Sequence, residues 1–353
     1  MINPCAVMMR RLDGGLYESF YFRGTSLDGQ QAFWLKHNLL RKKDGKQIQL
    51  DLAIILFDRT SHKTELAHCS QILSEDQLPV DWQSFHWSSH PHSFCQIQAE
   101  HLGGGIVAQS KNARWDLQCQ NQGELLLHFP HERWYHSAWP KKKLLTVSSR
   151  ILFHGSIQIG TQTLHGPWLG MQGHNWGREH AYRYAYANCT DFDQADAYFD
   201  GLSAQLAIAH KRIITPRLSL GVLCLGRQWY RFNQLERALF QPVTKLDHEN
   251  WQIELSNRTH RLRVQVSAPS PETCAWVALN YDHPDGNRSV VRNTKFAQIN
   301  LELLDKGQKL IQSISSDRCE LETLMPEDLP TMGYSTPLLM QTSDTEHLSS
   351  PHI

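Results

Sequence analysis

The sequence predicts an all-β fold of antiparallel sheets, and three observations support this prediction. Apolar and polar residues alternate with a period of two along most of the chain, which is the pattern of strands with one buried face. Turn signals that favour hairpins separate these runs, and helical patterns are scarce. Many short strands with turns between them are typical of sandwiches and barrels.

Each expected strand has its own pattern. Residues 50–57 are almost continuously apolar, as for a strand that is covered on both faces. Residues 113–120 alternate without interruption, residues 251–255 repeat the alternation, and residues 156–164 show it more weakly. We therefore expect strands in all four segments.

The turns follow from residues that favour positive φ or local hydrogen bonds. Residues 256–260 and 305–308 each separate two expected strands, and residues 283–287 contain an Asp-Gly pair, a stronger turn signal. Residues 194–210 have a helix-favouring composition, but Gly201 interrupts it, so we expect a strand there. Residues 326–353 contain four prolines and a polar end, which predicts an extended or disordered tail.

Composition narrows the class of partner. Lys plus Arg and Asp plus Glu both number 35, so the net charge is zero with His neutral. No long-range field therefore attracts nucleic acid. No apolar run reaches the length of a membrane span, and the first eleven residues do not resemble a signal peptide. We expect a soluble, cytoplasmic protein without a transmembrane segment.

Metal and cofactor sites are not expected. His86 and His90 have the spacing of zinc-binding helices, but Trp87 replaces the required Glu and Pro91 disfavours a helix. The eight cysteines are dispersed without a Cys-x-x-Cys pair, which indicates buried, reduced thiols. We therefore predict no metal and no cofactor.

The most informative segments are Gly173–Gly177 and Tyr198–Gly201. They place His174, Trp176, Tyr198 and Asp200 within runs that otherwise read as strands. A carboxylic acid beside aromatic rings can stay protonated near neutral pH, because burial disfavours its charged form. Such an acid could protonate or orient an apolar substrate while aromatic faces stabilise positive charge. The alternative is that these residues only close a barrel.

Three other groups of polar residues have a structural interpretation that we favour. Glu18 is expected to face outward or to pair with Arg23. Strand alternation sends Lys36 and His37 to opposite faces, so we expect one of them to point inward. Residues 178–180, Arg-Glu-His, are expected to form an ion-paired network.

Two segments resemble a known family. They are residues 17–24 with 32–37, and residues 173–181 leading into Tyr184, Tyr186 and Cys189. Together they resemble the lipocalin-like proteins grouped around AttH and hydroxyneurosporene synthase (carotenoid 1,2-hydratase). Tocopherol cyclases and Diels–Alderases are similar at a greater distance.

This resemblance implies two calycin (lipocalin-like) antiparallel β-barrels, which we place at residues 1–178 and 179–325. It implies an apolar ligand site lined by both barrels or lying between them. By analogy with the carotenoid hydratases, Asp200 would donate a proton to an alkene and Trp176 would stabilise the carbocation. His174 and Tyr198 would hold the acid or the attacking water.

The sequence thus predicts a protein that binds an apolar small molecule of isoprenoid, polyketide or fatty-acyl type. Acid-assisted hydration or cyclisation is the reaction that would follow, which would make the protein a lyase or an isomerase. One alternative is a non-catalytic carrier of a hydrophobic ligand. Another is a stress-related scaffold that binds a protein and lacks a cavity of ligand size.

Overall fold

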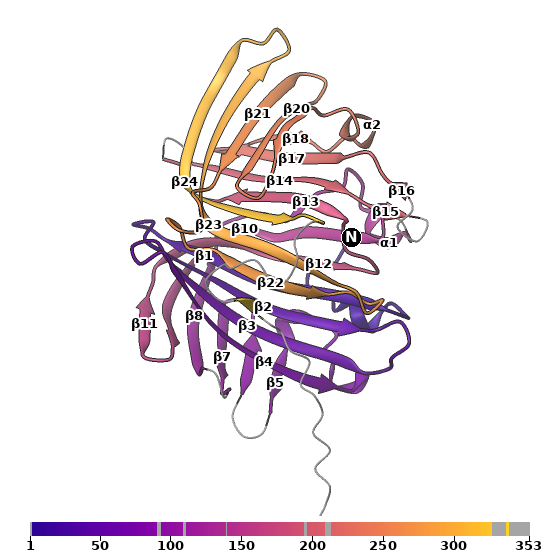
Figure 1. Cartoon of the computed structure of the whole chain (residues 1–353), viewed down its shortest axis with the longest axis vertical. Helices are drawn as coiled ribbons and strands as arrows, with labels where there is room; N and C mark the ends of the chain where they lie inside the picture. Colours follow the sequence, from indigo (N-terminus) through magenta and orange to yellow (C-terminus); the bar gives the residue numbers. More distant parts are fainter. Residues whose placement is uncertain are drawn as a thin grey trace, which may run out of the picture.

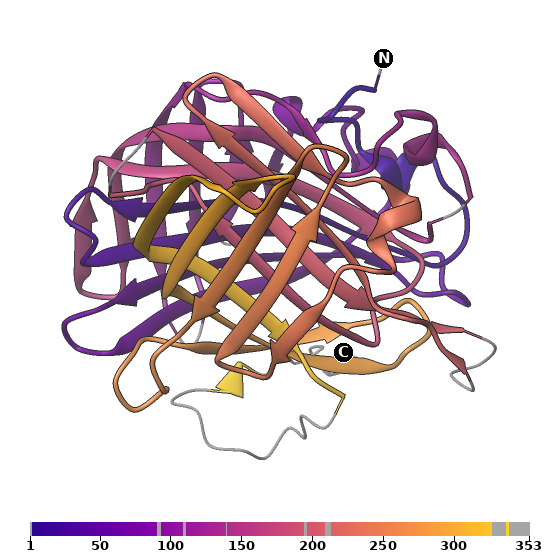
Figure 2. The ribbon, with the colours of Figure 1, turned by 90° about the horizontal axis from the view of Figure 1, so that it is seen from above.

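The fold consists of two large β-sheets that lie one above the other (Figure 1). In a computed structural model, the described residues are 2–89, 93–108, 111–138, 140–193, 196–208, 213–326 and the short strand 337–338. Figure 2, seen from above, shows the strands of the second sheet crossing those of the first. The predicted tail therefore lies almost entirely outside the described residues.

The first sheet is formed by the N-terminal part of the chain. Within the described residues it has twelve strands in the order β4-β3-β2-β1-β12-β10-β8-β7-β6-β5, with β9 and β11 paired to β10. All of its pairs are antiparallel. Its strands are β1 (Leu16–Ser26), β2 (Gln31–Arg41), β3 (Ile48–Asp58), β4 (Lys63–Leu73), β5 (His86–Ser88), β6 (Phe94–Ile97), β7 (His101–Ile106), β8 (Ala113–Asn121), β9 (Leu126–Leu127), β10 (Lys142–Ile159), β11 (Gln162–His165) and β12 (Trp168–Gly177).

The second sheet follows in sequence. Its described part has eleven strands, with the main path β18-β17-β14-β13-β24-β23-β21-β20-β19 and with β22 joining β23 to β25. Only the pair β22–β25 is parallel among these strands. Its strands are β13 (Arg183–Cys189), β14 (Ala197–Gln205), β17 (Leu218–Leu225), β18 (Gln228–Phe232), β19 (Val243–Leu246), β20 (Asn250–Ser256), β21 (His260–Ser267), β22 (Val277–Asp282), β23 (Arg288–Asp305), β24 (Leu310–Leu324) and β25 (Pro337–Leu338).

Smaller elements complete the described chain. A separate hairpin pairs β15 (Ala207–Ile208) with β16 (Ile213–Ile214). The helices are single turns: the 3₁₀ turns η1 (Met8–Arg10), η2 (Glu75–Gln77) and η3 (Trp82–Ser84), and the α-helical turns α1 (Arg133–His136) and α2 (Leu235–Ala238). The described residues contain no helix that is long and apolar enough to cross a bilayer.

The predicted all-β fold class is confirmed, and several predicted elements are confirmed with it. Strand β8 alternates strictly between buried and exposed residues up to position 120, whereas β3 is buried on both faces. The Asp-Gly turn at Gly286, with φ of 83°, joins β22 to β23. Strands β14 and β15 occupy most of the described part of segment 194–210, but 156–164 is a hairpin that turns at Gly160.

Two apolar cores account for the two layers. One core lies inside the curve of the first sheet and includes Phe20, Phe33 and Trp82. The other core is shared by both sheets. Trp34 on β2 and Phe57 on β3 lie on the face turned away from the first core, and they pack with residues of the second sheet. The first sheet ends at residue 177 and the second begins at residue 183, but the division into domains 1–178 and 179–325 stays a prediction.

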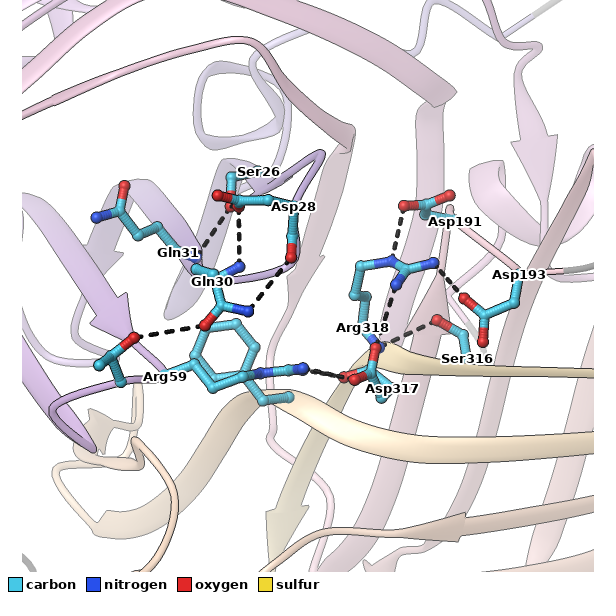
Figure 3. Close-up of polar contacts among 12 residues, drawn as sticks. Ser26, Asp28, Gln30, Gln31, Arg59, Asp191, Asp193, Ser316, Asp317 and Arg318 are labelled. Atoms are coloured by element: carbon cyan, nitrogen blue, oxygen red, sulfur yellow. Dashed lines mark hydrogen bonds and ion pairs between the residues drawn. The ribbon is translucent and has the colours of Figure 1, made fainter.

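An ion-pair network ties the sheets together at one end (Figure 3). Arg59, which follows β3, donates to the Asp317 carboxylate on β24 at 2.5 Å and packs over the Phe296 ring. Arg318 on the same strand donates to Asp191 at 2.8 Å and to Asp193 at 2.5 Å. Strand β24 is thereby held against the first sheet and against the loop between β13 and β14.

Candidate functional site

A cavity of about 100 Å³ lies between the two sheets. Strands β1, β2 and β3 form one wall, and β13, β22 and β24 form most of the other. Alternation explains the lining, because odd-numbered positions of β1 and even-numbered positions of β2 face the second sheet. The lining is rich in aromatic and ionisable side chains, including Tyr17, Tyr21, Trp34, Lys36, Lys142, His180, Tyr184, Tyr186, Tyr281, Glu320 and Glu322.

Asp200 is fully buried on β14, where the two sheets meet. Its Oδ2 accepts hydrogen bonds from the hydroxyls of Tyr198 at 2.7 Å, Thr146 at 3.0 Å and Tyr186 at 3.2 Å, and from the Asn188 amide at 3.1 Å. Thr146 belongs to the first sheet, whereas the other three donors belong to the second. One carboxylate oxygen therefore connects both sheets.

The other carboxylate oxygen, Asp200 Oδ1, is buried without a hydrogen-bond partner among the described residues. His128 Nε2 lies 3.7 Å from Oδ2. Burial lowers the pKa of His128, although the Asp200 charge opposes this. Burial, together with the Asp200 charge, raises the pKa of Tyr198 and Tyr186 well above the usual range. Both phenols therefore remain neutral donors at physiological pH.

Tyr186 connects Asp200 to the cavity. The Asp200 side chain is not part of the cavity lining, whereas Tyr186, which donates to it, is. Tyr21 on β1 lies beside Tyr186. Burial raises the pKa of Tyr21 well above its usual range, and the charges of Glu320 and Asp200 raise it further. The buried acid and the cavity are thus separated by a single layer of phenol side chains.

His174 and Trp176 belong to a different cluster from Tyr198 and Asp200. In the β10–β12 pairing, Leu145 is opposite His174 and Thr146 is opposite Gly173, so the His174 side chain lies on the face away from Thr146. His174 Nε2 lies 2.9 Å from Glu18 Oε1, and its Nδ1 lies 2.8 Å from the Pro4 carbonyl. The Trp176 and His174 ring centroids are 4.7 Å apart. The structure therefore brings the four predicted residues together only in pairs.

Glu18 is not a surface residue, and the expectation that it faces outward or pairs with Arg23 is wrong. It is 1% exposed and accepts hydrogen bonds from the backbone N–H groups of Met8 and Met9 and from the Trp82 indole. Glu18 and Arg23 are five positions apart on one strand, so they face opposite sides of the sheet. Glu18 instead anchors the N-terminal segment.

Lys36 and His37 are both buried, because both faces of β2 are covered. His37 lies near Phe22 and Phe85 in the first-sheet core, and burial lowers its pKa to about 3. Lys36 faces the cavity, where its Nζ donates to the Tyr281 hydroxyl at 2.6 Å. Burial lowers the pKa of Lys36 to about 7, although Glu322 opposes this.

Trp34 contacts two ammonium groups. The Nζ atoms of Lys36 and Lys295 are each 4.1 Å from its ring centroid. Lys295 also pairs with Glu320, and burial lowers the pKa of Lys295 to about 8 despite that partner. Indole is the preferred aromatic partner of a cation, so the Trp34 ring stabilises both ammonium groups.

The carboxylates of β24 are compensated in different ways. Glu320 pairs with Lys295 and with Arg23, whose Nε is 2.9 Å away. Glu322 accepts from the Tyr184 hydroxyl at 2.6 Å and from the Asn293 amide at 3.0 Å. Glu320 is thus compensated by two cations and Glu322 by hydrogen-bond donors, and both residues line the cavity.

The remaining expectations have mixed outcomes. In the 178–180 segment, Glu179 pairs with Lys141 at 2.7 Å, whereas His180 stacks on Tyr17 with ring centroids 3.8 Å apart and lines the cavity. The described residues contain no group of three or more metal-ligating side chains, and His90, Pro91 and His92 lie outside them. All eight cysteines are free thiols, and all except Cys69 are buried.

Comparison with known sequences identifies similar proteins. Residues 154–324 match the family model described as tocopherol cyclase-like. Two uncharacterized proteins of Mycobacterium tuberculosis, from strains CDC 1551 / Oshkosh and H37Rv, are each 27% identical over 203 residues. These alignments cover 56% of this chain and 58% of each relative.

Comparison with solved structures identifies the fold. An AttH-like protein from Nitrosomonas europaea superposes with a TM-score of 0.50 and 10% identity, covering 89% of this chain and 93% of that chain. CghA superposes with a TM-score of 0.59 and 11% identity, covering 89% of each chain. The chain is therefore similar in sequence to tocopherol cyclase-like proteins and shares the lipocalin-like fold of AttH-like proteins and CghA, which confirms the resemblance that its two motifs indicated.

Proposed function

We propose that the protein binds an apolar small molecule between its two sheets and catalyses acid-assisted hydration or cyclisation of it, with Asp200 as the proton source. The observation that supports this most strongly is the asymmetry of the Asp200 carboxyl group. Four donors surround Oδ2, whereas Oδ1 has no partner among the described residues. A protonated Asp200 can therefore hold its proton on Oδ1 without losing any hydrogen bond.

The donors around Oδ2 suit an acid that must release a proton. When the proton leaves, negative charge develops on the carboxylate, and the hydroxyls of Tyr198 and Thr146 already point at it. Donors that are fixed before reaction stabilise such charge without reorganisation. Burial in the inter-sheet layer keeps bulk water from competing for the proton.

In hydration, the proton of Asp200 moves to one alkene carbon and the π electrons form the new C–H bond. Water then adds to the resulting cation, and the proton that it releases returns to the carboxylate. In cyclisation, a hydroxyl or a second double bond of the substrate takes the place of water. An aromatic face such as that of Tyr21, which lines the cavity, stabilises the cation without bonding to it.

Tyr186 has the position of a proton relay. It lines the cavity and donates to Asp200 Oδ2. In a relay its hydroxyl gives that proton to the substrate and then accepts the proton of the Asp200 carboxyl instead of donating to it. Tyr198 also donates to Asp200 but does not line the cavity. In this proposal His174 and Trp176 have a structural role, because they lie on the far face of β12.

The comparisons support this chemistry at the level of class. The tocopherol cyclase-like family model covers β13 and β14, the strands on which Tyr186 and Asp200 lie. The description of this family model supports a cyclase-type reaction, and in our proposal Asp200 supplies the acid for it.

The experiment is labelling in heavy water. Organic extracts of the purified protein and a panel of alkenes are incubated in D₂O with wild type and with Asp200→Asn, and the products are analysed by mass spectrometry. Protonation of carbon places one non-exchangeable deuterium in the product of both reactions. In hydration this deuterium and an exchangeable O–D group together add the mass of D₂O. We expect label with wild type and at least a hundredfold less with the variant.

A non-catalytic carrier gives a different result. In that case wild type and variant retain the same unchanged molecule, and neither introduces deuterium. Equal labelling by both proteins would instead assign the acid to another residue. Circular dichroism of the variant confirms that its fold is intact.

A further inference from the structure

A second cleft lies at the β18 edge of the second sheet. It has a volume of about 770 Å³ and is lined by residues of segment 125–134, in the connection from β8 to β10, and of segment 231–236, from β18 to α2. These lining residues are all different from those of the inter-sheet cavity. Ligand pockets usually measure roughly 300–1,000 Å³, so this cleft is large enough for a ligand of its own.

One wall of the cleft is apolar and held in place. Its apolar members are Leu125, Leu127, Phe129 and Trp134. Leu125 is 37% exposed, and Leu127 and Trp134 are half-buried. The Phe129 backbone N–H donates to the Tyr135 hydroxyl at 3.3 Å, and this hydroxyl donates to the Leu144 carbonyl on β10 at 2.9 Å. Apolar side chains gathered beside an open space are typical of a binding groove, and this one is formed before any ligand binds.

Arg231 turns toward this wall from the second sheet. In the register of β14, β17 and β18, Asp200 is opposite Val222, and Val222 is opposite Arg231. Residues opposite one another in neighbouring strands point to the same face, and Asp200 faces the first sheet, where Thr146 donates to it. The Arg231 side chain therefore also faces the first sheet, and its guanidinium lies over the Trp229 ring, 5.4 Å from the centroid.

The cleft carries an excess of positive charge. Its charged lining residues are Arg133, Arg231 and Glu236, two cations and one anion, which leave a formal charge of +1 with His131 neutral. Both arginines are exposed, and within the part of the chain that the structure describes neither guanidinium forms an ion pair or donates a hydrogen bond. Guanidinium groups bind carboxylates through charge-assisted hydrogen bonds. A head group with a single negative charge therefore matches the cleft.

We propose that this cleft binds a single-chain amphipathic carboxylate of the fatty-acid type. Its chain lies along the apolar wall, and the guanidinium groups of Arg133 and Arg231 balance its charge. The site goes beyond the proposed function, because its lining includes neither Asp200 nor Tyr186. Burial of the chain supplies affinity in proportion to the apolar area that is covered, and the charge selects the head group.

The test separates the head group from the chain. Octanoate and octan-1-ol have chains of the same length, but only octanoate is charged at neutral pH. Binding of each to the full-length protein is measured by calorimetry at low salt and at about 1 M NaCl, where the screening length falls to about 3 Å. The variants are Arg231→Met, Arg133→Met and Leu125→Ser. Arg258→Met, in the exposed turn between β20 and β21, is the matched control.

We expect wild type and Arg258→Met to bind octanoate about fivefold more tightly than octan-1-ol at low salt. High salt should reduce this preference to less than about twofold. Arg231→Met should lose most of the preference and Arg133→Met part of it, while both keep their affinity for octan-1-ol. Leu125→Ser should weaken the binding of both ligands by a similar factor, because it removes part of the chain wall. All four side chains are exposed, so the fold should be unchanged.

A photoreactive octanoate determines where the ligand lies. A diazirine in its chain loses nitrogen on illumination and inserts into nearby C–H or N–H bonds, and mass spectrometry of the peptides then identifies the contacted segment. We expect adducts on residues 125–134 and 231–236, and an excess of octanoate should prevent them.

Adducts on β1, β2, β22 or β24 would place the ligand in the inter-sheet cavity and overturn the proposal. Equal affinity of wild type for octanoate and octan-1-ol, or no measurable binding of either, would overturn it as well. Asp200→Asn should bind octanoate as wild type does, so the result does not depend on the proposed function. Loss of octanoate binding in that variant would instead place the ligand at the buried acid.

Discussion

Glu18 Oε1 lies 2.9 Å from His174 Nε2, and both side chains are 1% exposed. This contact joins β1 to β12 and is completed by the Pro4 carbonyl, which His174 meets through Nδ1. It gives the histidine of the Gly-His-Asn-Trp-Gly string a specific structural role. The N-terminal segment is held in place through it.

His174→Gln should therefore reduce stability more than activity. Removing the imidazole leaves the Pro4 carbonyl without this partner and Glu18 with its three other donors only, which costs about 1–3 kcal/mol. Urea denaturation of the variant measures the loss, with His165→Gln on the exposed position of β11 as the control. Activity per folded molecule should change less than threefold. A stable variant without activity would instead return His174 to the catalytic role that the family resemblance implies.

Tyr186→Phe and Tyr198→Phe form a matched pair of substitutions. Each removes one hydroxyl that donates to Asp200 Oδ2, but only Tyr186 lines the cavity. If Tyr186 relays the proton, its variant should lose at least a hundredfold in deuterium labelling, whereas Tyr198→Phe should lose about tenfold. Equal losses would mean that both hydroxyls only stabilise the carboxylate.

The ammonium of Lys36 should make stability depend on pH. Its pKa is about 7 in the folded state against 10.5 as the ordinary value, so between these values the unfolded chain binds more protons. Stability then rises with pH in that window. Lys36 faces Glu322, Glu320, Asp51 and Lys295, and these groups are unchanged in Lys36→Met.

The difference in unfolding free energy between Lys36→Met and wild type isolates this effect. From pH 7 to pH 9 the unfolding free energy of wild type should rise by roughly 2 kcal/mol relative to that of Lys36→Met, because each unit of pKa difference is worth about 1.4 kcal/mol. Urea titrations at both pH values give the measurement. A difference that does not change with pH would show that Lys36 keeps its charge throughout.

The shared core predicts cooperative unfolding. Trp34 and Phe57 of the first sheet pack in one cluster with Phe199 and Trp251 of the second. We therefore expect a single calorimetric transition whose enthalpy matches the van't Hoff value. Two separated transitions would indicate that residues 1–178 and 179–325 are independent domains that merely touch.

The sequence predicts local structure well where one face of a strand is buried. The alternation in β8 and the Asp-Gly turn at Gly286 depend on neighbours in sequence, so pattern alone identifies them. Alternation also indicates that His174 shares a face with Trp176, and Tyr198 with Asp200. It does not indicate that the two pairs face different layers, because this depends on which face of β12 meets the second sheet.

The cavity residues are hidden from sequence analysis for a related reason. Glu320 and Glu322 alternate with apolar residues along β24, which is also the pattern of a strand with a solvent-exposed face. Lys36 has the same ambiguity on β2. His128 follows three leucines and is distinguished by no motif. Burial of these polar groups arises only when one sheet covers the other, a long-range property.

The walls of the cavity come from strands that are far apart in sequence, β1 to β3 on one side and β22 and β24 on the other. Any molecule that fills it must touch both sheets, so it acts as a reversible cross-link between the two ends of the chain. Such a molecule raises the melting temperature in proportion to the logarithm of its concentration once its site is saturated. The melting temperature of the protein therefore shows whether the cavity is occupied. A library of compounds can be ranked by the shift that each one causes before any reaction is known.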